Sequence, residues 1–109
     1  MLLNDRFDLG ILLRRGAILL DVRTHEEFVG WHLRGAVNIP AEELDNRLET
    51  LARWDTPLLV YSGKDKRSYR AARKLRLHGL EAYDAGEARS LGQWINTYGD
   101  RVSFRPPQA

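Results

Sequence analysis

Two short, continuously apolar runs constrain the fold of this chain more than any other feature. They read AILLDV (17–22) and PLLVYS (57–62), and polar or turn-forming residues bound each of them. A short apolar run without alternation is typical of a strand that is covered on both faces, as in a parallel sheet. The chain therefore needs helices on both sides of a central sheet.

The segments around these runs supply further strands and the helices. AVNIP (36–40) and EAYDA (81–85) are weaker strands, and Thr24 is placed to cap a helix over THEEFVGWH. Gly79 is expected to end a basic helix. The alternation of helix and strand predicts an α/β fold, with a parallel sheet of four to five strands and right-handed crossovers. The other helices are expected over 5–15, 41–54, 67–78 and 88–99.

Length and composition indicate one domain. The 109 residues fit a single core, which we place at 1–98, and the segment 99–109 loses periodicity and forms a C-terminal tail. The chain has no cysteine, which excludes disulfides and thiolate metal ligands. No apolar run reaches the roughly 18 residues of a membrane span, and the first residues lack a cationic signal region. We expect no membrane and a cytoplasmic location, as a whole protein or as a module of a larger one.

Charge is concentrated in one segment. The chain carries a net charge of +2, but residues 64–76 contain seven basic residues and one acid, Asp65. The favoured interpretation is a solvated helix face. The alternative is a nucleic-acid surface, whose affinity would fall steeply with salt. Because no nucleic-acid motif or aromatic stacking platform accompanies the basic segment, we expect no nucleic acid as a partner.

The loop that follows the second apolar run has the character of an anion site. It reads SGKDKR (62–67) and leads from a strand into a helix, so successive backbone N–H groups and the helix N-terminus form an anion nest. Gly63 relaxes the backbone, while Lys64, Lys66 and Arg67 add positive charge. A thiol at the first position would have its pKa lowered from about 8.5 toward about 3.5–7.5. The residue in that position is Ser62.

Four motifs in register resemble one known family. The chain contains LLDVRTHEEF (19–28), HLRGAVNIP (32–40), LLVYSGKDKRS (58–68) and YDAG (83–86). In this order they resemble a rhodanese homology domain, over about residues 4–98. The YDAG ending and the short chain are most similar to the small single-domain thiosulfate sulfurtransferases of the phage-shock type. The resemblance implies a three-layer α/β/α fold.

The resemblance also implies an activity and a site. Family enzymes take sulfur from thiosulfate or a similar donor, hold it as a cysteine persulfide and pass it to cyanide or a thiol, without a cofactor or metal. Their six-residue loop opens with the catalytic cysteine and closes with an arginine. Ser62 and Arg67 stand at these positions. The implied loop that binds thiosulfate, sulfate or a similar anion is Gly63, Lys64, Asp65, Lys66, Arg67 and Ser68, and the supporting residues are Asp21, Arg23 and His32.

Serine at the nucleophile's position predicts an inactive domain. A hydroxyl is a far weaker acid than a thiol, and oxygen holds no stable persulfide. Two explanations stay open. The serine is natural and the domain binds anions or a protein partner, which Asp65 in the loop favours, or an active sulfurtransferase is represented as a Cys-to-Ser variant.

Other chemistries of this loop fit less well. A serine-hydrolase triad would need His25 to face Ser62, and the sequence has no G-x-S-x-G elbow. A phosphatase would need a thiolate and a longer loop. We assign His32 a packing or hydrogen-bonding role, because no metal-ligand cluster accompanies it.

Overall fold

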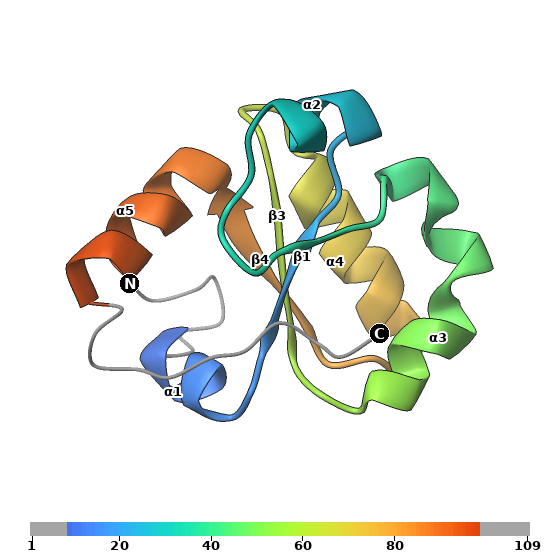
Figure 1. Cartoon of the computed structure of the whole chain (residues 1–109). Coiled ribbons are helices and arrows are strands. Elements are labelled where there is room, and N and C mark those ends of the chain that lie inside the picture. Colours follow the sequence, from blue (N-terminus) through green and yellow to red (C-terminus); the bar gives the residue numbers. More distant parts are fainter. Residues whose placement is uncertain (1–8, 99–109) are drawn as a thin grey trace.

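The computed structural model describes residues 9–98 and contains a four-stranded parallel sheet (Figure 1). The strand order is β2-β1-β3-β4, with parallel pairing between each pair of neighbours. The parallel sheet, predicted to have four to five strands, is confirmed. The strands are β1 (Ile18–Asp21), β2 (Val37–Asn38), β3 (Leu58–Ser62) and β4 (Ala82–Glu87). The helices are α1 (Leu9–Arg14), α2 (His25–Gly30), the 3-10 helix η1 (Ala41–Asn46), α3 (Leu48–Trp54), α4 (Arg67–Leu77) and α5 (Ala88–Tyr98).

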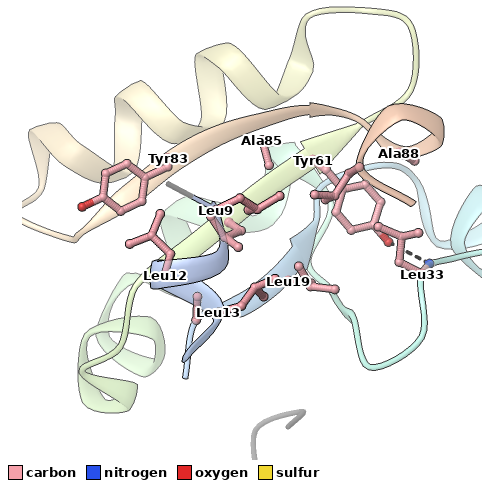
Figure 2. Close-up of a cluster of buried hydrophobic side chains, with 12 residues drawn as sticks. Leu9, Leu12, Leu13, Leu19, Leu33, Tyr61, Tyr83, Ala85 and Ala88 are labelled. Carbon is pink, nitrogen blue, oxygen red and sulfur yellow. Dashed lines mark hydrogen bonds between the residues drawn. The ribbon is translucent and has the colours of Figure 1, made fainter. Parts of the chain in front are cut away.

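Helices cover both faces of the sheet, and alternate strand residues feed two cores. Figure 1 shows α1 and α5 on one side, α3 and α4 on the other, and α2 beyond one end of the strands. Figure 2 shows the first core, in which Leu19 and Tyr61 pack with α1 and α5. The Tyr61 hydroxyl accepts a hydrogen bond from the Leu33 N–H at 3.2 Å. Leu20 and Val60 point to the opposite face and pack with α3 and α4. The apolar runs are thus continuous because both faces of these strands are buried.

The helix ends follow from the local sequence. Thr24 and Glu27 form a capping box that starts α2, as the sequence predicted for Thr24. Gly79 lies beyond the end of α4 with a φ of +84°, which confirms its predicted role. The predicted helix over 5–15 begins at Leu9 in the described chain. Residues 5–8 and the predicted tail 99–109 lie outside the described residues.

The single helix predicted over 41–54 is wrong. The structure divides the segment into η1 and α3 at Arg47, whose φ of −120° lies outside the helical range. The two pieces bury Leu44 and Leu51 in the same core. A 3-10 turn readily connects two elements, and here η1 links β2 to α3 while both leucines stay in the core.

The pairing of β3 with β4 contains one register shift. Val60 pairs with Asp84, but the next residue, Tyr61, pairs with Gly86, so Ala85 is an additional residue on β4. Gly86 has a φ of +82°, a conformation in which glycine has no steric penalty. Strand β4 therefore extends beyond the predicted 81–85 to Glu87, which pairs with Ser62.

Candidate functional site

The loop 62–67 lies at the carboxyl end of β3, between the sheet and α4. In an open α/β sheet this end of the strands is where ligands bind, because the loops to the following helices gather there. Helix α2 lies beside the loop, since Arg67 at the start of α4 pairs with Glu27 of α2. The loop also lies close to the end of β1, because Asp21 of β1 pairs with Tyr61 of β3.

Ser62, the last residue of β3 and the first of the loop, is fully buried. Its Oγ accepts a hydrogen bond from the Ser68 N–H at 3.1 Å and donates one to the Asp65 carbonyl oxygen at 3.4 Å. The loop thus curls around the position that the resemblance assigns to the reactive atom. The Ser62 hydroxyl is a hydrogen-bonded internal group of the loop.

Four successive backbone N–H groups of the loop carry no hydrogen bond to any residue within 9–98. They belong to Gly63, Lys64, Asp65 and Lys66, which lie between the end of β3 and the start of α4. Consecutive free N–H groups next to a helix N-terminus favour an anion. The Lys64 and Lys66 side chains are exposed and add positive charge. These features support the predicted anion site.

Arg67 is held by two carboxylates. Its Nη1 and Nη2 donate to the two oxygens of Glu27 at 3.1 and 3.2 Å, and its Nε forms an ion pair with Asp65. The ion pair lacks the alignment of a hydrogen bond. Donation from Arg67, with a smaller contribution from Thr24, lowers the pKa of Glu27 to about 2. Arg67 therefore fastens the loop to α2, and its charge is neutralised within the chain.

Asp21 and Arg23 form a buried ion pair at the end of β1, where the sequence predicted a supporting role. Arg23 Nη2 lies 2.7 Å from Asp21 Oδ2 and 2.6 Å from the carbonyl oxygen of Trp31. The Asn38 side-chain amide donates to the carbonyl oxygens of both Asp21 and Arg23 at 3.0 Å. Asn38 is a supporting residue that the sequence interpretation missed.

Neither of the two candidate histidines, His25 and His32, contacts Ser62 in the described chain. His32 stacks on Phe28 with 3.7 Å between ring centroids, and its Nδ1 lies 2.7 Å from the Phe28 carbonyl oxygen. These contacts fit a packing and hydrogen-bonding role at the end of α2. His25 is the exposed first residue of α2, and no contact between it and Ser62 occurs in the described chain.

A hollow of about 570 Å³ lies between the loop and the carboxyl end of β4. One wall contains the loop and the first turn of α4. The other wall contains Asp84, Gly86 and Glu87, none of which is among the site residues that the family resemblance implied. The sequence signals for Asp84 and Gly86 were the end of the predicted strand 81–85 and the YDAG motif, and Glu87 lies outside both. Neither signal showed that these residues would line one hollow, because that depends on the register shift between β3 and β4.

The described residues hold neither a cluster of metal ligands nor a membrane-spanning helix. Residues 9–98 contain no group of three or more His, Cys, Asp or Glu side chains that would hold a metal ion. None of their helices has the length and apolar character to cross a bilayer.

The fold and loop define a class of protein: an α/β domain that presents a buried side chain and a nest of amides at the end of a central strand. The chain matches the Rhodanese-like domain family over residues 8–89 and belongs to that family. This confirms the family resemblance seen in the four motifs.

Solved structures with the same architecture include a sulfurtransferase. The chain is similar to the human single domain sulfurtransferase TSTD1, with a TM-score of 0.56 and 27% identity over 74% of this chain and 82% of that one. A protein from Lactobacillus plantarum has a TM-score of 0.64 and 24% identity, over 75% of this chain and 71% of that one. The second similarity supports the fold alone.

Two curated relatives are longer than the matched segment. The uncharacterized protein YqhL of Bacillus subtilis is 45% identical over 65 residues, which cover 60% of this chain and 51% of that protein. The HTH-type transcriptional regulator Rv0324 of Mycobacterium tuberculosis is 50% identical over 54 residues, which cover 47% of this chain and 24% of that protein. The matches thus span about half and about a quarter of these relatives.

Proposed function

We propose that this chain is a rhodanese-like domain of the sulfurtransferase lineage that binds a small oxyanion in the loop 62–67 and does not transfer sulfur. The observation that carries the proposal is the position of Ser62. Its Oγ lies inside a loop whose next four N–H groups have no partner in the described chain. Ser62 stands in the nucleophile's place, and the surrounding loop keeps the character of an anion site.

Sulfur transfer is not expected because position 62 carries a hydroxyl oxygen where the family reaction needs a thiolate sulfur. In the family reaction a cysteine thiolate attacks the outer sulfur of thiosulfate. An S–S bond forms to the enzyme, the S–S bond of thiosulfate breaks, and sulfite leaves with the electron pair. Cyanide then takes the outer sulfur of the persulfide as thiocyanate and restores the thiolate. A serine hydroxyl stays protonated at neutral pH, and its oxygen does not form the corresponding stable intermediate.

The test compares the native chain with Ser62→Cys. Thiocyanate formation from thiosulfate and cyanide is measured, together with a mass increase of one sulfur on the protein. Ser90→Cys on the exposed side of α5 is the matched control, because it introduces a thiol outside the loop. We expect background activity from the native chain and from Ser90→Cys. Turnover by the native chain would overturn the proposal.

The alternative is an active thiosulfate sulfurtransferase represented as its Cys-to-Ser variant. The intact nest favours it, and it predicts strong turnover by Ser62→Cys. The paired charges of Asp65, Glu27 and Arg67 favour natural serine, because they reduce the positive charge that a dianionic donor would meet. Codon 62 of the natural gene separates the two explanations: a serine codon supports the inactive domain, and a cysteine codon supports the active sulfurtransferase.

Further parts of the proposal concern the partner and the location. Thiosulfate and sulfate are the small anions expected in the loop, and a protein partner is the second kind of ligand. A cytoplasmic location belongs to the same proposal. Sulfate titration followed by the amide resonances of residues 63–66 tests anion binding directly, and unchanged resonances would contradict it.

A further inference from the structure

We propose that the hollow beside the loop binds a small zwitterion, with its anionic end on the loop and its ammonium end on Asp84 and Glu87. The inference rests on the proposed anion-binding loop and adds the class of ligand. It is carried by the segregation of charge between the two walls of one hollow.

The loop wall is positive. Lys64 and Lys66 line the hollow and make no ion pair within the described chain. Residues 63–66, whose N–H groups have no partner in the described chain, line the same wall. Asp65 also lines the hollow, but its carboxylate is paired with Arg67. The loop wall therefore offers two lysines without ion pairs and a set of backbone donors to an anionic group.

The β4 wall is negative because of the register shift. Side chains alternate along a strand, so Asp84 and Glu87 would point to opposite faces in a regular strand. The additional residue, Ala85, changes the phase of the alternation, and both carboxylates line the hollow. One oxygen of Asp84 accepts the Gly86 N–H at 2.9 Å. Glu87 has no ion pair or side-chain hydrogen bond in the described part of the chain.

The balance of these charges selects the ligand class. The hollow is lined by two lysines and by three carboxylates, those of Asp65, Asp84 and Glu87, and Asp65 shares the single positive charge of Arg67 with Glu27. A simple dianion would gain from the lysines and lose by repulsion from Asp84 and Glu87. A zwitterion satisfies both walls. Because both carboxylates are partly buried, their attraction for an ammonium group is screened less than at an open surface.

The exposed ring of Tyr69 is a third feature of the hollow. Tyr69 lies in the first turn of α4 and lines the hollow. An aromatic face favours a short aliphatic chain, and it also attracts a cation close to the ring. A ligand with a few methylene groups between its two charged ends therefore fits this lining.

The experiment titrates the native chain with aminoalkanesulfonates of two to four methylenes and with the matching alkanesulfonates that lack the amine. Amide resonances of residues 63–66 report binding at neutral pH. We expect at least one aminoalkanesulfonate to bind about fivefold more tightly than its matching alkanesulfonate, the size of a weak ion pair. The double variant Asp84→Asn with Glu87→Gln should remove this preference and leave alkanesulfonate binding equal or tighter.

The control is Glu42→Gln with Glu43→Gln, which changes net charge by the same amount on the exposed first turn of η1. It should keep the preference of the native chain. Equal affinity for amine-bearing and amine-free sulfonates in the native chain would overturn the zwitterion site and leave the anion loop standing. Absence of binding by both sulfonates and by inorganic sulfate would overturn the anion loop as well.

Discussion

The guanidinium of Arg67 meets the carboxylate of Glu27 through two parallel hydrogen bonds of 3.1 and 3.2 Å. Arg67 closes the loop and Glu27 lies in the first turn of α2, so this pair joins two segments that are 40 residues apart. Glu27 also accepts the Thr24 N–H in the capping box. One carboxylate thus connects the start of α2 to the start of α4.

Removing this carboxylate should destabilise the chain in a pH-dependent way. Glu27→Gln is expected to lower the free energy of unfolding at pH 7 by about 0.5–1 kcal/mol, a modest value because the Glu27 side chain is 42% exposed and solvent screens the pair. The pKa of Glu27 is lowered on folding to about 2. Its contribution is therefore complete above the ordinary value of 4.5 and is lost as the pH falls toward 2.

Urea denaturation at pH 7 and at several lower pH values measures this dependence. Glu26→Gln is the matched control, since Glu26 lies in the same first turn of α2 and does not pair with Arg67. The gap in stability between Glu27→Gln and the native chain should narrow in acid. A gap that stays constant from pH 7 to pH 2 would show that the ion pair does not cause the loss.

The Ser62 hydroxyl should contribute to stability even without a catalytic role. Ser62→Ala leaves the buried N–H of Ser68 without its acceptor, which is expected to cost about 1–2 kcal/mol. Chemical denaturation measures the cost, and Ser90→Ala on the exposed face of α5 should stay within about 0.5 kcal/mol of the native chain. A Ser62→Ala protein as stable as the native chain would contradict this role.

Breaking the buried ion pair of Asp21 and Arg23 should destabilise the protein more than breaking any other ion pair in the described chain. Asp21→Asn leaves Arg23 buried without a counter-charge, at an expected cost of about 3 kcal/mol. Glu49→Gln breaks the exposed pair with Arg53 and should cost less than about 0.5 kcal/mol. Thermal and urea denaturation of the two variants compare the sites. Similar small losses in both would mean that Asp21 does not hold Arg23 as the geometry indicates.

Replacing Gly86 should destabilise the chain because of its backbone conformation and not because a side chain would clash with its surroundings. A Cβ at Gly86 would meet no atom within 4 Å, but its φ of +82° is unfavourable for alanine, and we expect Gly86→Ala to cost about 1–2 kcal/mol. Gly30 also has open space and lacks a positive φ, so Gly30→Ala should be neutral or stabilising. The difference between the two variants in urea denaturation isolates the conformational cost. If Gly86→Ala is also neutral, the register shift tolerates a side chain.

Much of the fold was predictable from local patterns. The apolar runs at 17–22 and 57–62 indicated strands buried on both faces, and β1 and β3 are the two central strands of the sheet. Thr24 and Gly79 marked helix ends through capping chemistry that involves only neighbouring residues. The division of 41–54 at Arg47 was not predictable, because the spacing of Leu44 and Leu51 suits one continuous helix.

The candidate site also has some features that the sequence determined and others that only the tertiary structure decided. By itself, the sequence determined the order of the strand, the loop and the helix, the basic character of 62–67, and the presence of serine at position 62, where the family resemblance implies a cysteine. Tertiary structure alone decided that Glu27 neutralises Arg67, and that Asp84 and Glu87 line one hollow. The physical reason is the separation in the chain over which each interaction acts. Propensity, capping and local charge act between neighbours in the chain, whereas the ion pair and the hollow depend on helix packing and strand register, which place distant residues side by side.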